Sequence, residues 1–244
     1  MIRDRPAADG ADLARILEAH SRYLESERRE GARADLRGVD LSHMSLVAAD
    51  LRRARLAHAR LDGADCCRAN LQGANLAGAS LRGARLREAD LSKARLSGAQ
   101  LAAADLAGAR LEQADMEFAL LTGAKLCGAR LRGADLSGAN LEGADLSGAD
   151  LQRANLRGAD LRDARLDGAN LRGTRLGGAI LSGASLRACD LRHAYLRVAK
   201  LDGADLSGAD LRDVTGLTTA QIGSMRRDDR TRLSPDPGPG GDNR

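Results

Sequence analysis

A leucine at every fifth residue is the feature that most constrains this chain. Between positions 36 and 211 the sequence holds 36 five-residue repeats, and leucine fills this position in 34 of them. Cys66 and Met116 are the two replacements. Two residues before it, alanine occurs in 32 of the 36 repeats. A pattern of this length is typical of a repeat architecture, in which each unit packs only against its neighbours.

A period of five fits neither an α-helix nor a straight β-strand. Five residues advance a helix by about 500°, so the leucines would spread around its axis. On a flat strand an odd period places successive leucines on opposite faces. The chain therefore has to bend once per repeat. If the leucine position is called i, positions i−2 and i face inward and the polar positions i−1 and i+1 face outward. The bend falls at i+2, which is glycine in 20 of the 36 repeats.

The repeat, written A-(D/N)-L-x-x and clearest in residues 134–150, resembles the pentapeptide-repeat family over most of the 244 residues. What the resemblance implies is an all-β solenoid: a right-handed quadrilateral β-helix with four repeats per coil and about nine coils. Inward leucines would stack in columns along the axis, and alanine is small enough for the corners. Each buried leucine contributes roughly 1.5–3 kcal/mol before the entropy of chain ordering is subtracted.

Both ends of a solenoid need a cover, because its core and its unpaired backbone would otherwise be exposed. We expect an N-terminal segment over 1–33 with a capping helix at 11–29, where apolar residues recur at helical spacing. The repeats occupy 34–213 and a C-terminal cap occupies 214–225. There, Thr218 and Gln221 predict a capping box, and Leu217 and Ile222 a hydrophobic staple. The polar, Pro/Gly-rich residues 226–244 are predicted to be disordered.

No catalytic, cofactor-binding or metal-ligating residue is predicted. The four cysteines form no CxxC pair, and no histidine stands at ligand spacing from any of them. The sequence contains no HExxH, GxSxG or phosphate-loop motif. It has no signal-peptide start and no run of about 18 apolar residues. We therefore expect a non-enzymatic cytoplasmic protein without a cofactor and without a membrane partner.

The charge does not favour nucleic acid as the partner. The formal net charge is +4, from 38 basic and 34 acidic residues that are interspersed along the chain. When the repeats are assigned to four faces, the most basic face also carries acidic residues and lacks aromatic residues on which bases could stack.

Apolar residues at outward positions are scarce, and five of them gather on one part of the predicted rod. Phe118, Leu120, Ile180 and Val198 fall along one vertical edge, with Tyr195 beside it. Several apolar residues on one edge indicate a contact surface. The expected occupant is another protein or a second copy of this chain.

A second interpretation follows from similarity to the Qnr and MfpA branch of the family, whose members protect DNA gyrase and topoisomerase from poisons with a DNA-like acidic rod. Such a role would make gyrase the partner and antibiotic resistance the outcome. The acidic surface beside the edge would then bind it: Asp115, Glu117, Asp135, Glu142, Asp160, Asp163 and Asp202. Five basic residues share that surface, so its net charge is only −2, and no insertion interrupts the repeats. A protein-binding scaffold is therefore the first interpretation, and topoisomerase protection is the alternative.

Overall fold

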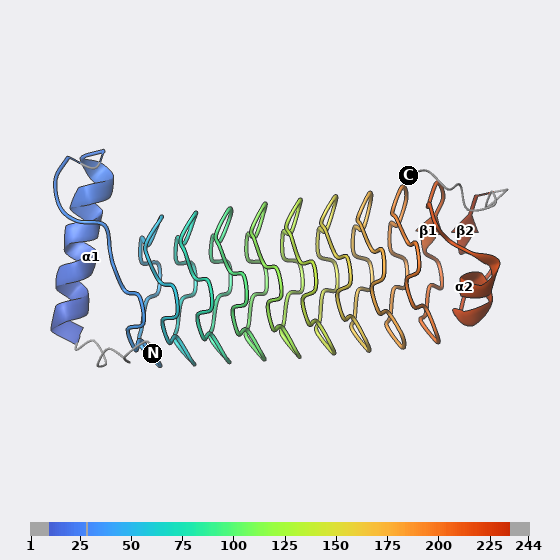
Figure 1. The fold of residues 1–244 in the computed structure, drawn as a ribbon, viewed down its shortest axis with the longest axis horizontal. Helices are drawn as coiled ribbons and strands as arrows, with labels where there is room; N and C mark the ends of the chain where they lie inside the picture. Colours follow the sequence, from blue (N-terminus) through green and yellow to red (C-terminus); the bar gives the residue numbers. More distant parts are fainter. Residues whose placement is uncertain (1–9, 28, 235–244) are drawn as a thin grey trace.

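The protein is a rod of stacked coils with a helix at each end (Figure 1). The structure, a computed structural model, describes residues 10–27 and 29–234. Its named elements are α1 (Gly10–Glu25), β1 (Asp210–Leu211), α2 (Thr219–Ser224) and β2 (Arg232–Leu233). The repeats lie between α1 and α2, and they form the body of the rod.

Backbone pairing sets the size of each coil. Parallel bridges join residues 20 positions apart, from Asp35 and Arg55 to Tyr195 and Thr215. Twenty residues are four repeats, so the 36 repeats correspond to nine coils. Each bridge is one residue wide because the chain bends before a second pair can form. The predicted β-helix is therefore present with little extended sheet. In the described ranges only β1 and β2 pair as strands of more than one residue.

In the central coils, four of the five N–H groups in each repeat are satisfied by backbone carbonyls. In the repeat around Leu136, the N–H groups of Leu136 and Gly138 donate to the following coil at 2.7 and 2.9 Å. The N–H of Asn140 donates to the preceding coil at 2.9 Å. The N–H of Ala139 donates to the Leu136 carbonyl at 3.0 Å and closes the turn. Only the N–H at i+1 lacks a backbone acceptor, and a buried or half-buried N–H needs one.

The side chain at i−1 supplies the missing acceptor. Asp135 Oδ1, for example, accepts the N–H of Ser137 at 2.9 Å. The same bond occurs in all 19 repeats that carry Asp or Asn at i−1. This is the local Asx turn that short side chains with an oxygen favour. The Asp/Asn preference at i−1 therefore has a structural cause in every coil.

The turn predicted at i+2 is confirmed. All 36 residues at this position have φ between 52° and 73°, the left-handed region that glycine adopts without strain. Glycine occupies 20 of these positions and other residues occupy 16. The inward positions form one continuous core, in which no residue at the leucine position i is more than 2% exposed.

The helix α1 covers the N-terminal end, and the buried His20 joins it to the coils. His20 Nδ1 accepts the N–H of Ala34 at 3.1 Å, and the opposite ring nitrogen, Nε2, lies 3.1 Å from the carbonyl oxygen of Arg52. A neutral ring protonated at Nε2 satisfies both contacts. One side chain thus pairs with two backbone groups that the stack leaves open at this end.

Acid is expected to loosen this cap. Burial lowers the pKa of His20, with Arg33 and Arg52 acting in the same direction, although the Arg52 carbonyl and Asp50 oppose it. Stability from the neutral ring is present above the ordinary histidine value of 6.5 and is lost as the pH falls through the lowered pKa. The hydrogen-exchange protection factors of the α1 amides, which correct for the intrinsic pH dependence of exchange, should therefore fall between neutral and mildly acidic pH. His20→Gln, whose amide can both accept and donate, should remove this dependence, whereas substitution of the exposed His58 should retain it. An unchanged pH profile in His20→Gln would refute the role.

The helix α2 covers the other end through the predicted capping box, which is confirmed. Thr218 N–H donates to Gln221 Oε1 at 2.7 Å, and Gln221 N–H donates to Thr218 Oγ1 at 3.3 Å. Gln221 Nε2 also donates to the carbonyls of Leu196 at 3.0 Å and Ala199 at 2.8 Å. Gln221 therefore supplies a donor to the Ala199 carbonyl and a second donor to the Leu196 carbonyl, which also accepts the N–H of Ala199 at 3.0 Å, a role that the motif did not predict.

Disorder is predicted from residue 226, but residues 226–234 continue the stack. Arg226 bridges to Asp205, and β2 pairs in parallel with β1. Asp228 Oδ1 accepts the N–H of Gly208 at 2.8 Å. The open backbone edge of the last coil offers hydrogen-bonding groups that a polar segment can pair with, and composition alone does not reveal such pairing. Residues 235–244, also predicted to be disordered, lie outside the described residues.

Candidate protein-binding surface

The structure places four of the five predicted apolar residues on two neighbouring columns. Phe118 and Val198 share the i+2 column, four coils and so about 19 Å apart. Leu120 and Ile180 share the next outward column, which the bridges between coils define. Tyr195 belongs to the same repeat as Val198, at i−1. These five residues are called the apolar edge below.

Exposure differs along the apolar edge. Phe118 is 66% exposed, Val198 73%, Tyr195 53% and Leu120 45%, whereas Ile180 is half-buried. Three glycines at 138, 158 and 178 separate Phe118 from Val198 in their column, and the space above Gly158 and Gly178 is open. The apolar edge is therefore an open strip with an apolar side chain at each end.

Phe118 and Val198 occupy left-handed turn positions, with φ of 55° and 52°. For a β-branched residue such as valine this conformation is an outlier that strains the backbone. The ring of Phe118 lies against the next coil, because a Cβ built on Gly138 would approach its Cε1 atom to 2.5 Å. Both positions thus combine exposure of an apolar side chain with a backbone conformation that suits glycine.

Three residues of the predicted acidic surface are turn acceptors. Asp115, Asp135 and Asp160 each accept the N–H two residues ahead. Partial burial raises the pKa of Asp135, but hydrogen bonds from Ser137 and Asn155 outweigh it, so its pKa lies below the ordinary carboxyl value. These carboxylates are committed to the fold.

Of the remaining four acids, Glu142 forms an ion pair with a described residue and three do not. Arg162 contacts Asp160 at 2.6 Å and Glu142 at 3.0 Å, and the hydrogen bond from Arg162 lowers the pKa of Asp160. The other three are exposed and form no ion pair within the part of the chain that the structure describes. They are Glu117, Asp163 and Asp202. The structure brings the acidic surface onto the faces beside the apolar edge, but local pairing leaves little of it available.

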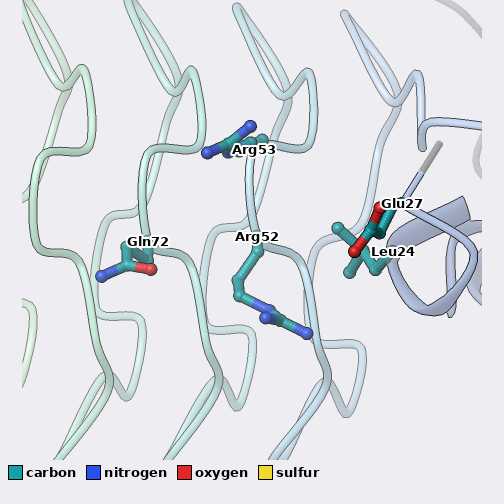
Figure 2. A pocket seen from close by; sticks show the side chains of 5 residues that line it. All are labelled: Leu24, Glu27, Arg52, Arg53 and Gln72. Carbon is teal, nitrogen blue, oxygen red and sulfur yellow. The ribbon is translucent and has the colours of Figure 1, made fainter.

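Hollows on the surface were not predicted. One lies where α1 meets the first coils, between Leu24 and Glu27 on one side and Arg52, Arg53 and Gln72 on the other (Figure 2). Its Arg52 is already paired with Asp50 at 2.6 Å. A second hollow lies along the same corner in the C-terminal half, between Gly133 and Tyr195. Both hollows could be recognised in the sequence, because both lie on one i+2 column in which glycines stand among residues with long side chains.

The cysteines offer no reactive site within the core. Burial raises the pKa of the Cys66 and Cys189 thiols to about 12. Over residues 10–27 and 29–234, no three His, Cys, Asp or Glu side chains gather to hold a metal ion. In the same ranges no helix is long and apolar enough to cross a membrane.

Comparisons with known proteins identify the repeat. A family profile described as pentapeptide repeats matches in overlapping segments that together span residues 32–215. HetL from the cyanobacterium Nostoc sp. strain PCC 7120, a pentapeptide repeat protein involved in heterocyst differentiation regulation, is 35% identical. That match covers 89% of this chain and 96% of HetL, with a TM-score of 0.36. No curated protein matches the chain.

Two further solved structures are similar. Rfr23 from the cyanobacterium Cyanothece 51142 is 30% identical over 47% of this chain and 64% of that one, with a TM-score of 0.35. A trypsin-treated variant of QnrB1, a plasmid-mediated fluoroquinolone resistance protein, is 19% identical over 76% of this chain and 87% of that one. Its TM-score of 0.54 shows a shared fold. With its repeats matched from end to end, the chain belongs to the pentapeptide-repeat family.

Proposed function

We propose that the protein is a non-enzymatic scaffold that binds another protein through the apolar edge. The observation that carries this proposal is the presence of apolar side chains at two exposed, left-handed turn positions, Phe118 and Val198. Glycine would suit both positions better, and it occupies 20 of the 36 equivalent ones. Apolar side chains retained there against local stability favour a role in binding.

The dimensions of the apolar edge fit a protein partner. The apolar edge is about 19 Å long, short enough to fit within a standard protein–protein interface, which buries roughly 800 Å² on each side. Phe118 and Tyr195 are large, exposed aromatic residues, and such residues commonly supply much of the binding energy at the centre of an interface. The glycines between Phe118 and Val198 leave room for side chains of the partner.

Glycine at positions 118 and 198 is expected to increase stability and decrease binding. Phe118→Gly and Val198→Gly relieve left-handed strain, so each should raise the free energy of unfolding by about 1 kcal/mol in chemical denaturation. The double variant should also lose a partner that wild type retains in quantitative affinity capture from a lysate of the source organism. Glu88→Gly is the matched control, because Glu88 is an exposed polar residue with φ of 57°. It should gain stability and keep the partner.

The scaffold proposal fails if the double variant captures the same proteins as wild type in the same amounts. Sedimentation of the purified protein tests the alternative occupant, a second copy of the chain. A dimer that the double variant abolishes would assign the apolar edge to self-association.

Topoisomerase protection is the second candidate, supported by the fold shared with QnrB1 and by the three unpaired acids of the acidic surface. In this case the purified protein should relieve cleavage that a poison stabilises on DNA gyrase. Lysine at Glu117, Asp163 and Asp202 should abolish the relief, because these carboxylates are exposed and not committed to turns. No relief and no gyrase binding at low salt would eliminate this candidate.

A further inference from the structure

The C-terminal hollow is a groove with a volume of about 760 Å³. In chain order, its corner comes immediately before the face of the rod that carries Tyr195. The turn column of Phe118 and Val198 forms the corner immediately after that face. Its lining includes Gly133, Arg153, Gly173 and His193, which succeed one another in one i+2 column. Glycine alternates with a long side chain in this column, so the hollows lie over the glycines. From Gly133 to His193 the groove crosses three coil spacings, about 14 Å.

Three arginines in the groove form no ion pair with a described residue, although the charge of Arg175 helps to lower the pKa of Asp135 in the same groove. Arg153, Arg172 and Arg175 are exposed, and none forms an ion pair within residues 10–27 and 29–234. Elsewhere an arginine at i+1 pairs with the aspartate at i−1 of its own repeat, as Arg192 does with Asp190 at 2.6 Å. In the repeat of Arg172 this position is Asn170, which carries no charge. Arg153 and Arg172 are therefore free to receive an external anion, and Arg175 is shared between such an anion and Asp135.

The rest of the lining cancels only part of this charge. Asp135 is the one carboxylate among the lining residues, and its Oδ1 accepts hydrogen bonds from Ser137 and Asn155. His193 Nδ1 lies 3.8 Å from Asp213 Oδ2. Tyr195, 53% exposed, adds an aromatic ring at the C-terminal end. The hollow with these side chains is called the basic groove below.

We propose that the basic groove binds an acidic, extended segment of a partner protein. Four residues of an extended chain span about 13 Å, close to the length of the basic groove. Guanidinium groups bind carboxylates with two parallel hydrogen bonds, which gives both affinity and orientation. Nucleic acid fits less well, because the free cations cover only three coils and a carboxylate lies among them. The inference concerns residues outside the apolar edge except for Tyr195, which belongs to both surfaces.

The test uses a fluorescent peptide with four consecutive glutamates and a second peptide with glutamines in their place. At low salt, fluorescence anisotropy should detect binding of the glutamate peptide only. Combining Arg153→Gln, Arg172→Gln and Arg175→Gln should weaken this binding at least about tenfold, because it removes all three charge-assisted contacts.

A matched control removes the same charge from the opposite face. Arg68→Gln, Lys125→Gln and Arg165→Gln replace three exposed residues that form no ion pair in the described part of the chain. This variant should bind the glutamate peptide within about twofold of wild type if binding depends on where the charges lie and not on the net charge of the protein. Gly173→Gln tests shape at constant charge. A Cβ there meets only Arg153 Cγ at 3.6 Å, and glutamine already occupies the equivalent turn position 113, so the coil should tolerate it.

Three outcomes would overturn the proposal: no binding of the glutamate peptide, equal losses in both triple variants, or unchanged binding in Gly173→Gln. Tighter binding of a single-stranded oligonucleotide that the groove variant abolishes would assign the basic groove to nucleic acid instead. Competition by inorganic phosphate as strong as that of the glutamate peptide would reduce it to a simple anion site. Phe118→Gly with Val198→Gly should leave peptide binding unchanged, so this test succeeds or fails independently of the apolar edge.

Discussion

Leu136→Asp is expected to unfold the coils around it. Leu136 is fully buried, and the residues one coil away on either side, Met116 and Leu156, are also buried and apolar, so the new carboxylate finds no partner. We expect a loss of more than about 4 kcal/mol in the free energy of unfolding, the range in which single substitutions abolish folding. The effect should spread because each coil is stabilised by its neighbours. Urea denaturation followed by circular dichroism measures it.

Leu120→Asp is the matched control, because Leu120 is an outward leucine, 45% exposed, only 16 residues away in the chain. This variant should unfold within about 0.5 kcal/mol of wild type. If Leu136→Asp retained the cooperative transition of wild type, the continuous core would not be the source of stability.

Gln221→Ala is expected to have the second largest effect, at the C-terminal end. It removes the side-chain donor to the carbonyls of Leu196 and Ala199 and the Gln221 half of the capping box, whereas the backbone N–H of residue 221 still donates to Thr218 Oγ1. An unsatisfied buried acceptor costs about 1–3 kcal/mol. Because the Ala199 carbonyl is only partly buried and the Leu196 carbonyl keeps the N–H of Ala199, we expect a total loss of about 1–2 kcal/mol, local to the last coils.

Hydrogen exchange measures this loss amide by amide. Protection should fall in the last coil and in the paired segment 226–234, while the central coils keep theirs. Gln72→Ala, at an exposed position with no side-chain hydrogen bond in the described residues, should leave every region unchanged. Equal protection of the last coil in Gln221→Ala and wild type would contradict the capping role.

The sequence predicts most of the coil, because each inward and turn position follows one rule. The leucine column, the left-handed turn at i+2 and the Thr218 capping box are all visible as local patterns. Tertiary pairing is not. Nothing local shows that Gln221 reaches the last coil or that residues 226–234 pair with its open edge.

The acidic row at i−1 shows the same limit for the candidate site. Aspartate occurs there in 14 of the 36 repeats, and from composition it resembles a surface for binding. In the structure each of these carboxylates accepts the N–H at i+1, so the residue type is explained by a turn that needs an acceptor. The free arginines of the basic groove were missed for the converse reason. Arg172 differs from a paired arginine only by Asn170 in place of aspartate.

The 20-residue register makes the two surfaces sensitive to the phase of the repeats. Deleting one whole coil between Phe118 and Val198 would shorten the strip by one coil spacing and keep both side chains in one column. Deleting a single repeat would preserve nearly every local hydrogen bond, yet it would rotate everything downstream by a quarter turn and carry Val198 to a different face. Length variation in such a rod is therefore tolerated by the fold in steps of five residues, but by its binding surfaces only in steps of twenty.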